Sequence, residues 1–292
     1  MNNHIKGVGK MGIRTDIAVE AHKLTCGEGK EIDGGKVTTA KKDDIVRTVV
    51  DILNEKGAEA LGKEIGRYVT IDAPQLKFSI DDYEAVCEMI KTEIREMAAN
   101  YDSTLVVGLG NRGITPDALG AQTVDKLIIT SHLKERMPDM FDDNYSCVSA
   151  VIPGVMGTTG INTVEIVKGV VEKVKPELVI AVDALAGADI NRVTTTIQIS
   201  DTGIAPGSGV GNHRDGLNFN SLGVQVIAIG VPTVIAAELL GGENLREEYK
   251  SLMVTTKDID LEIQRMSKTI ANGINMALHK NMTLRTVEEL VG

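Results

Sequence analysis

Residues 178–186 read Leu-Val-Ile-Ala-Val-Asp-Ala-Leu-Ala, a continuous apolar run that contains one carboxylate, Asp183. Short apolar runs of this kind are typical of strands that are covered on both faces in a parallel sheet. Other β-rich runs occur at 104–108, 127–130, 148–152, 195–199 and 224–229, and helical segments separate many of them. This alternation predicts an α/β fold with a mixed, largely parallel sheet sandwiched between helices.

The segments around this frame have their own patterns. Apolar residues at helical spacing predict amphipathic helices at 83–97 and 259–274. The Gly- and Lys-rich stretch 26–42 predicts a loop. The next two patterns predict a helix over 43–66, broken near Gly57, and a strand over 67–73.

Composition narrows the function classes. The chain has 292 residues, 42% hydrophobic and 25% charged, which is ordinary for a globular protein. Its net charge of −10 argues against nucleic-acid binding, and the absence of Trp argues against base stacking. No apolar run approaches the roughly 20 residues of a membrane span. No secretory signal is recognisable either, so we expect a cytoplasmic protein that binds neither nucleic acid nor membrane.

The position of Asp183 in the sequence favours a role in a ligand or catalytic site. A strand that ends with this residue delivers its carboxylate to the carboxyl edge of the sheet, where open α/β sheets place ligand sites. Such a carboxylate needs hydrogen bonds or a partner charge. An aspartate that caps the following turn is the structural alternative, and the sequence leaves both open.

A second carboxylate follows a glycine-rich turn. Residues 108–120 read Gly-Leu-Gly-Asn-Arg-Gly-Ile-Thr-Pro-Asp-Ala-Leu-Gly. Thr115-Pro116-Asp117 has the pattern of a helix start, which by itself explains Asp117. If Asp117 and Asp183 face each other, however, they share a proton. One could then activate a water while the other protonates a scissile carbonyl, which is peptide hydrolysis without a covalent intermediate.

A third motif is the loop at 201–212, Asp-Thr-Gly-Ile-Ala-Pro-Gly-Ser-Gly-Val-Gly-Asn. Backbone amides at Gly209 and Gly211, followed by Asn212 and Arg214, could bind a substrate carbonyl or an oxyanion. A long loop held by its own turns is the alternative. Gly-Ser-Gly is not the nucleophile elbow of serine hydrolases.

Together the three motifs resemble the germination protease family, endopeptidases that degrade small acid-soluble proteins of bacterial spores. The resemblance extends from about residue 14 to about residue 279. It implies a fold similar to that of the hydrogenase maturation proteases, Asp117 and Asp183 as the essential aspartates, a homotetramer, and spore proteins as substrate. The sequence departs from the family pattern at Ala121, where proline is usual, and at 187–189, where a basic residue is more common.

The N-terminus carries a related signal. Thr15-Asp16-Ile17-Ala18 resembles the family's own substrate site. The resemblance implies a zymogen that cuts itself between Asp16 and Ile17, which divides the chain into a leader, 1–16, and a single protease domain, 17–292. A polar tail is the alternative. An acidic residue before the cut needs a cation, and Arg112, Arg192 and Arg214 are candidates.

Three other functions compete with this interpretation. Gly108, Gly110 and Gly113 fit the G-x-G-x-x-G pattern of a dinucleotide-dependent oxidoreductase, but the next predicted strand ends without the expected acid. A metalloenzyme would need ligands, and the histidines form no recognisable cluster (His22, His132, His213 and His279). The third is a non-enzymatic binding protein. We expect no metal and no cofactor.

Overall fold

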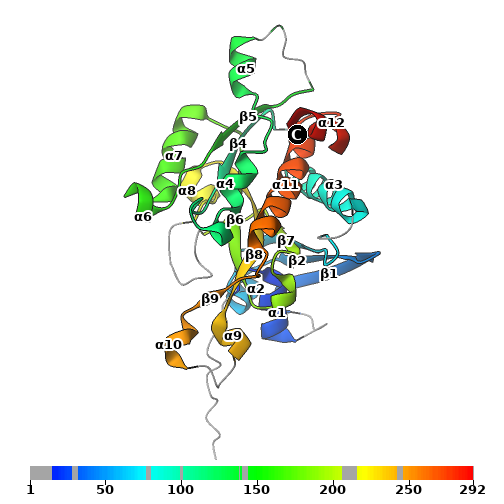
Figure 1. Ribbon diagram of the computed structural model, residues 1–292, viewed down its shortest axis with the longest axis vertical. Coiled ribbons are helices and arrows are strands. Elements are labelled where there is room, and N and C mark those ends of the chain that lie inside the picture. The colour runs from blue at the N-terminus through cyan, green and yellow to red at the C-terminus, as the bar shows by residue number, and fades with distance from the viewer. Residues whose placement is uncertain are drawn as a thin grey trace, which may run out of the picture.

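The computed structural model describes residues 15–27, 32–76, 80–98, 101–137, 139, 144–205, 216–241 and 246–291. Within these residues the chain builds one nine-stranded sheet in the order β1-β2-β3-β7-β8-β6-β4-β5, with β9 added to β8. Figure 1 shows α3, α4 and α11 in front of this sheet, and α5, α9 and α10 at the two extremities.

The strands are β1 (Gly35–Lys42), β2 (Ile45–Ile52), β3 (Gly66–Asp72), β4 (Ser103–Gly108), β5 (Cys147–Val151), β6 (Leu178–Gly187), β7 (Thr196–Ser200), β8 (Gln225–Ala236) and β9 (Met253–Val254). The α-helices are α1 (Ala18–Cys26), α2 (Glu55–Leu61), α3 (Ile80–Met97), α4 (Leu119–Val124), α5 (Ser131–Arg136), α6 (Met156–Thr159), α7 (Thr163–Val174), α8 (Phe219–Leu222), α9 (Ala237–Gly241), α10 (Glu247–Lys250), α11 (Ile259–Leu278) and α12 (Leu284–Val291). Two 3₁₀ helices, η1 (Thr115–Asp117) and η3 (Ile190–Arg192), also bear on the site.

The sheet has two parts of different character. Parallel pairing joins β5, β4, β6 and β8, which we call the parallel half. Antiparallel pairing joins β1, β2, β3 and β7, the antiparallel half, and attaches it to β8. The α/β class and the mixed sheet are therefore confirmed. The parallel part is smaller than the sequence indicated, because five of the eight strand pairs among the described residues are antiparallel.

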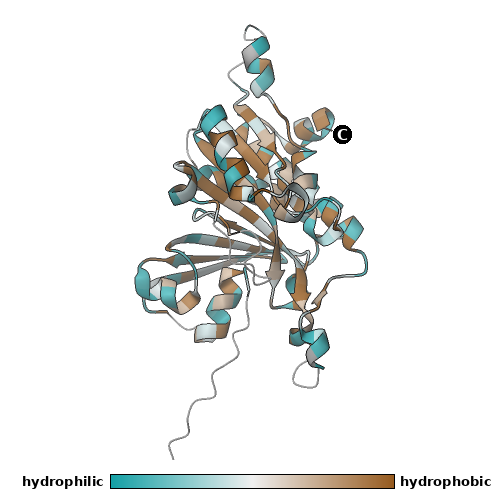
Figure 2. Cartoon of the chain, turned by 90° about the vertical axis from the view of Figure 1, so that its left-hand side faces the viewer, coloured by the Kyte–Doolittle hydropathy of each residue, from teal (hydrophilic) through white to brown (hydrophobic). Residues whose placement is uncertain are grey.

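Alternate residues of the central strands supply two cores, as expected for a sheet covered on both faces. On one face Val106, Ile180 and Ile227 pack against α3 and α11. On the other, Val107 and Val179 pack with residues of α7. Figure 2 shows the apolar strands enclosed between helices whose outer surfaces are polar. In the antiparallel half, the face opposite α3 packs with residues of α1 and α2.

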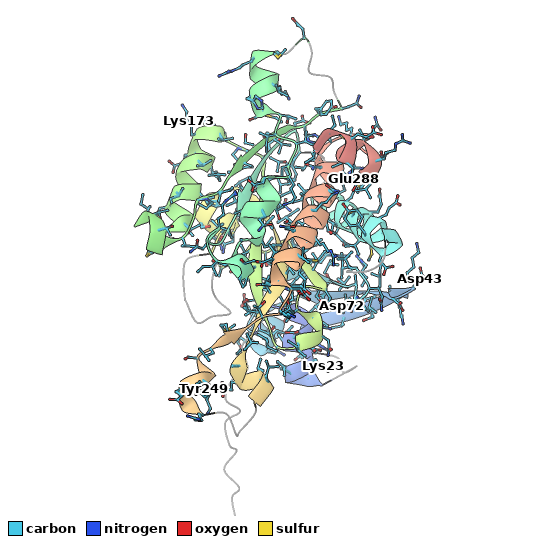
Figure 3. All side chains as sticks on the ribbon, viewed as in Figure 1. Lys23, Asp43, Asp72, Lys173, Tyr249 and Glu288 are labelled. Carbon is cyan, nitrogen blue, oxygen red and sulfur yellow. The ribbon has the colours of Figure 1, made fainter. Side chains whose placement is uncertain are left out.

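The helix predicted over 43–66 is wrong. The segment Ile45–Ile52 is β2, because its β-branched residues fit a pleated surface better than a helix. It forms a hairpin with β1, where the sequence predicted a loop, and Asp43 turns the chain with a φ of 54°. This residue lies at the tip of the hairpin (Figure 3). A helix begins only at α2, where the Asn54 side chain accepts from two backbone N–H groups.

The strand predicted over 127–130 is also wrong. Its backbone makes turn and side-chain bonds instead of a strand ladder: Leu127 N–H donates back to the Val124 carbonyl at 3.2 Å, and Ile128 N–H donates to Asn275 Oδ1 at 2.9 Å. Only Thr130 N–H donates to a strand, at the Val148 carbonyl of β5, at 3.1 Å. The other predicted strands and both amphipathic helices are confirmed, with shifted ends. No helix in the described part of the chain is long and apolar enough to cross a membrane.

Candidate active site

Asp183 lies on β6 in the parallel half and is 4% exposed. Its Oδ1 accepts from the Ala184 N–H at 2.9 Å. The strand β4 pairs with β6 only as far as Gly108, which lies opposite Val182. Asp183 therefore follows the last residue of β6 that β4 covers, at the carboxyl edge predicted from the sequence.

Asp117 is placed by the turn that leaves β4. Gly110 has a φ of +92°, and a Cβ there would lie 2.0 Å from the Asp117 carbonyl oxygen. Only glycine fits both conditions. A Cβ on Gly108 would lie 2.4 Å from the carbonyl oxygen of Gly120. The glycines thus shape the turn that carries Asp117, as the sequence suggested.

The local bonds of Asp117 do not follow the predicted cap. It ends η1, whose N-cap position is Ile114 and whose first turn has no side-chain cap. Instead, Oδ2 of Asp117 accepts from the Asn111 N–H at 2.7 Å. The predicted helix start is present, with Pro116 and Asp117 in its first turn, but Thr115 is not the N-cap and the Asp117 carboxylate bonds back to the glycine turn.

The pKa values of both carboxyls are raised. Burial is the largest cause that raises the pKa of Asp183 well above its ordinary value, and the negative charge of Asp117 raises it further. Burial also raises the pKa of Asp117, while the bond from Asn111 N–H opposes that shift. Both carboxyls therefore favour the protonated form more than an isolated aspartate does.

The sheet register connects Asp183 with a polar residue of the antiparallel half. Gly230 of β8 lies opposite Asp183 of β6 on one side and opposite Gln198 of β7 on the other. Directly opposed residues project from the same face of a sheet. Because neighbouring strands lie about 4.8 Å apart, the Cα atoms of Asp183 and Gln198 are about 10 Å apart, with a glycine between them.

The predicted processing site lies beside this row. Asp16 N–H donates to the Ala186 carbonyl at 3.0 Å, and Ala186 N–H donates to Asp16 Oδ2 at 2.9 Å. The charge of Asp16 is a further cause that raises the pKa of Asp183. Ile17, on the other side of the bond, is fully buried. The structure thus brings the segment predicted to be cut next to the predicted catalytic pair.

Two residues that the sequence analysis missed hold this segment. The Asp16 carbonyl oxygen accepts from Lys63 Nζ at 2.9 Å and from Gln198 Nε2 at 3.0 Å. Gln198 Oε1 in turn accepts from the Ala18 N–H at 2.6 Å. A glutamine inside the covered strand Thr196–Ser200 was a usable signal, because a buried amide needs partners. Nothing in the sequence around Lys63 distinguishes it from a surface lysine.

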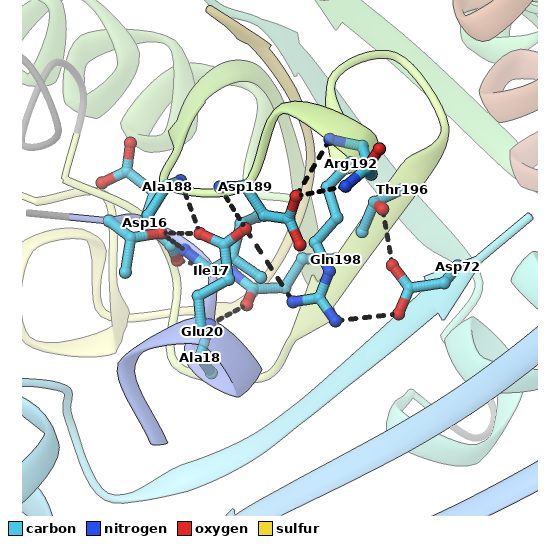
Figure 4. A network of polar contacts seen from close by, with 12 residues as sticks. Asp16, Ile17, Ala18, Glu20, Asp72, Ala188, Asp189, Arg192, Thr196 and Gln198 are labelled. Atoms are coloured by element: carbon cyan, nitrogen blue, oxygen red, sulfur yellow. Dashed lines mark hydrogen bonds and ion pairs between the residues drawn. The ribbon is translucent and has the colours of Figure 1, made fainter. Parts of the chain in front are cut away.

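A second polar network continues along the same edge of β6 (Figure 4). Glu20 of α1 accepts from the N–H groups of Ala188 and Asp189 at 2.7 and 3.1 Å. Arg192 lies 3.8 Å from Glu20 and 3.2 Å from Asp72. This arginine, a predicted substrate contact, is therefore already engaged in ion pairs with Glu20 of α1 and Asp72 of β3.

The other predicted substrate contacts are placed differently. Arg112 makes a two-pronged pair with Asp125, both bonds at 2.8 Å, and both side chains are about half exposed. Gly209, Gly211, Asn212 and Arg214 lie outside the described residues. The described ends of their loop, Ala205 and Gly216, line a cavity of about 340 Å³. Asp16, Lys63 and Gln198 also line it, so the cavity lies next to the predicted cut.

The structure also bears on the cofactor-dependent alternatives. In the dinucleotide pattern the third glycine opens a helix, whereas here Gly113 is followed by η1, and α4 begins only at Leu119. Of the five histidines, His22 and His279 are buried, His132 is exposed, and His4 and His213 lie outside the described residues. No three His, Cys, Asp or Glu side chains among the described residues are grouped so that they could hold a metal ion.

Comparison of the sequence with known proteins matches germination proteases throughout. The family model described as germination protease matches residues 14–245. Germination proteases of Clostridium perfringens and Caldanaerobacter subterraneus are each 43% identical over 96% of this chain, covering 99% and 98% of their own lengths. That of Bacillus velezensis is 38% identical over 97% of this chain and 98% of its own. A NiFe hydrogenase maturation protease of Thermococcus kodakarensis matches 62% of this chain and 98% of its own, at 17% identity and a TM-score of 0.36.

Proposed function

The chain belongs to the germination protease family and is an aspartic-type peptidase, and we propose that it initiates the degradation of small acid-soluble spore proteins during germination. Family membership decides against the oxidoreductase and the non-enzymatic binding protein. The proposed cut follows an acidic residue, and the proposed place of action is the cytoplasm of the spore core. The assembly proposed by resemblance is a homotetramer.

The observation that carries the mechanism is the proximity of two carboxyls with raised pKa values to a peptide bond preceded by an aspartate. In the proposed reaction, ionised Asp117 takes a proton from a water whose oxygen adds to the scissile carbonyl carbon. Protonated Asp183, the more buried of the two, gives its proton to the leaving nitrogen. This assignment uses the stronger upward shift of Asp183, since the group with the higher pKa is the acid.

The leader, residues 1–16, is proposed to be the first substrate, with residues 17–292 as the protease domain. Support comes from Asp16, whose backbone and carboxylate both bond to Ala186 three residues beyond Asp183. Arg192 is proposed to bind acidic substrate side chains together with Arg112 and Arg214, and for Arg192 this requires an exchange of its present pairs with Glu20 and Asp72. The loop with Gly209, Gly211 and Asn212 is proposed to bind a substrate carbonyl through its backbone amides, and its described ends, Ala205 and Gly216, line the cavity beside Asp16.

The test is incubation of the full chain with a purified small acid-soluble spore protein in the presence of a chelator, followed by mass spectrometry. We expect fragments that end in Asp or Glu, and a shortened enzyme that begins at Ile17. Asp183→Asn should give neither product. Cleavage after other residue types would contradict the proposed specificity, and cleavage by a folded Asp183→Asn variant would contradict the mechanism.

A further inference from the structure

Two side-chain donors converge on one oxygen of the leader. The Asp16 carbonyl oxygen receives the Lys63 ammonium at 2.9 Å and the Gln198 amide nitrogen at 3.0 Å. This oxygen belongs to the peptide bond that joins Asp16 to Ile17. Both are hydrogen-bond distances to the carbonyl oxygen of the uncut bond, and they leave the two donors close to the position that an oxyanion formed there would take. The donors come from separate elements, Lys63 from the turn after α2 and Gln198 from β7.

Gln198 also fixes the other side of the same bond. Its Oε1 accepts from the Ala18 N–H at 2.6 Å, while its Nε2 donates to Asp16. Lys63 reaches one residue further back and donates to the Thr15 carbonyl oxygen at 3.1 Å. Three residues around the predicted cut, Thr15, Asp16 and Ala18, are therefore held at main-chain atoms, on both sides of the bond between Asp16 and Ile17.

The edge of β6 explains how another peptide could take the same place. Leu109 N–H donates to Val182 at 2.8 Å, and Ala186 exchanges two bonds with Asp16, so alternate residues of β6 face one edge. Beyond Val182, β4 no longer pairs with this edge. An extended peptide added there makes main-chain bonds that do not depend on its sequence. The Ala186 N–H would then donate to the acidic side chain of the bound peptide, as it donates to Asp16 Oδ2 here.

We propose that Lys63 and Gln198 form the oxyanion-binding pair of this protease, first for the Asp16 carbonyl and then for the carbonyl before the cut in a protein substrate. The proposal rests on the proposed function and assigns it two catalytic residues from the antiparallel half. It also assigns recognition of the acidic residue in part to a main-chain N–H.

The chemistry uses these donors at one step. When the water oxygen bonds to the Asp16 carbon, the carbonyl oxygen becomes negative, and the water's proton moves to the basic carboxylate. The Lys63 ammonium and the Gln198 amide bind that negative charge. The carbon–nitrogen bond then breaks, Ile17 nitrogen takes the proton of the acidic carboxyl, and Asp16 leaves with a new carboxyl group.

The environment of Lys63 fits this role. Burial lowers the pKa of its ammonium, while the carboxylates of Asp16 and Glu20 oppose that shift. A cation that is poorly hydrated gains more from a developing negative charge than one in water. Loss of one donor of this type typically costs about 10²- to 10³-fold in the rate of the chemical step.

The experiment measures self-cleavage of the full chain, because an intramolecular cut has no binding step to confuse with the chemical step. Lys63→Met and Gln198→Met are compared with wild type by intact-mass spectrometry. Lys56→Met and Gln264→Met serve as matched controls, since both side chains are exposed. We expect about 10²- to 10³-fold slower cleavage in the two site variants and rates within twofold of wild type in the controls.

A second measurement separates catalysis from simple anchoring of the leader. In an Asp183→Asn background, hydrogen exchange at the Asp16 and Ala186 amides reports whether the leader still lies on β6. Slow cleavage with retained protection supports the proposal. A wild-type rate in Lys63→Met and Gln198→Met, or slow cleavage with loss of that protection, overturns it.

One further variant tests whether the charge of Lys63 is what matters. Lys63→Arg keeps the charge, and we expect it to retain at least about a tenth of the wild-type rate; a loss as large as in Lys63→Met would overturn the charge-based role. Failure of the wild type to cut at Asp16–Ile17 would instead overturn the proposed function. If the wild type cuts, Asp183→Asn does not, and Lys63→Met cuts normally, only the oxyanion proposal fails.

Discussion

The two halves of the sheet supply different parts of the candidate site. The parallel half carries both aspartates, one on β6 and one on the turn after β4. The antiparallel half and its connections carry Lys63 and Gln198, which hold the peptide. Gly230 of β8 joins the halves, because it lies opposite Asp183 and Gln198 at the same level of the sheet. In the proposed mechanism, proton transfer therefore belongs to the parallel half, while the donors to the Asp16 carbonyl oxygen belong to the antiparallel half, and the two halves must stay in register.

The largest effect on the cleavage rate is expected from replacing the two aspartates of the parallel half, which leaves the antiparallel half unchanged. Asp117→Asn and Asp183→Asn should each reduce cleavage of an acidic-site peptide by about 10³-fold or more, because acid–base groups contribute roughly 10²–10⁴-fold each and the pair acts as a unit. Initial rates at saturating peptide measure this. The Lys56→Met variant is the control, and a folded aspartate variant with more than a tenth of wild-type activity would contradict the division of labour.

The next effect loosens the antiparallel half without touching the site. Glu93 of α3 has a side chain only 3% exposed and pairs with Arg47 of β2. Arg47→Met leaves that carboxylate buried and unpaired, which should cost about 3–5 kcal/mol of unfolding free energy. Lys91→Met, which breaks an exposed pair with Glu88, should cost less than about 1 kcal/mol. Urea unfolding measures both, and equal losses would show that the two pairs are equivalent.

The turn that carries Asp117 can be tested by one pair of substitutions within the same glycine motif. In Gly110→Ala the new Cβ meets the Asp117 carbonyl at 2.0 Å, so the carboxyl must move. We expect about 10²-fold slower cleavage, the typical cost of misplacing a catalytic group by about 1 Å. In Gly113→Ala the nearest atom is 3.3 Å away and φ is ordinary, so activity should stay within about threefold. Equal effects would remove the special role of Gly110.

The buried Asp183 carboxyl of the parallel half should make the unfolding free energy depend on pH. An unfolded aspartate titrates near a pKa of about 3.9, whereas burial, Asp117 and Asp16 raise the pKa of Asp183 in the folded protein. Between the two values only the folded state keeps the proton, so stability present below about pH 4 is lost as pH rises. Asp183→Asn cannot ionise, and its unfolding free energy relative to wild type should therefore increase from pH 4 to pH 7. A constant difference in urea unfolding would contradict the raised pKa.

The same division explains what the sequence could predict. The parallel half was recognisable because its strands are continuous apolar runs, and because Asp183 follows such a run directly while Asp117 follows one after a glycine-rich turn. The antiparallel half was missed because β1 is mostly exposed and β2 mixes charged with β-branched residues. Neither strand has a clear period by itself, and their pairing is a tertiary event.

The site followed the same pattern. The aspartates could be picked out from local motifs, although β6 continues past Asp183 to Gly187, where the sequence predicted the strand to end with Asp183. Lys63, in contrast, acquires its position only when the turn after α2 folds against residues 15 and 16, nearly 50 positions earlier in the chain. Gln198 carried a weak signal, as a polar residue in a covered strand. The glycine motif was interpreted correctly as a turn, since Pro116 and Asp117 displaced the helix start.

The smallest expected effect compares one substitution in a helix of each half. Gly169 lies in α7, and a Cβ there meets nothing within 4 Å, so Gly169→Ala should raise the unfolding free energy by about 0.5–1 kcal/mol. Gly57 lies in α2, where a Cβ would be 2.3 Å from the Gly34 carbonyl oxygen. Gly57→Ala should lower stability by about 1–3 kcal/mol, because the backbone must shift. It should also slow self-cleavage more than Gly169→Ala does, since α2 leads into the turn with Lys63. If both substitutions stabilise the protein, the close contact between α2 and the turn before β1 does not constrain the antiparallel half.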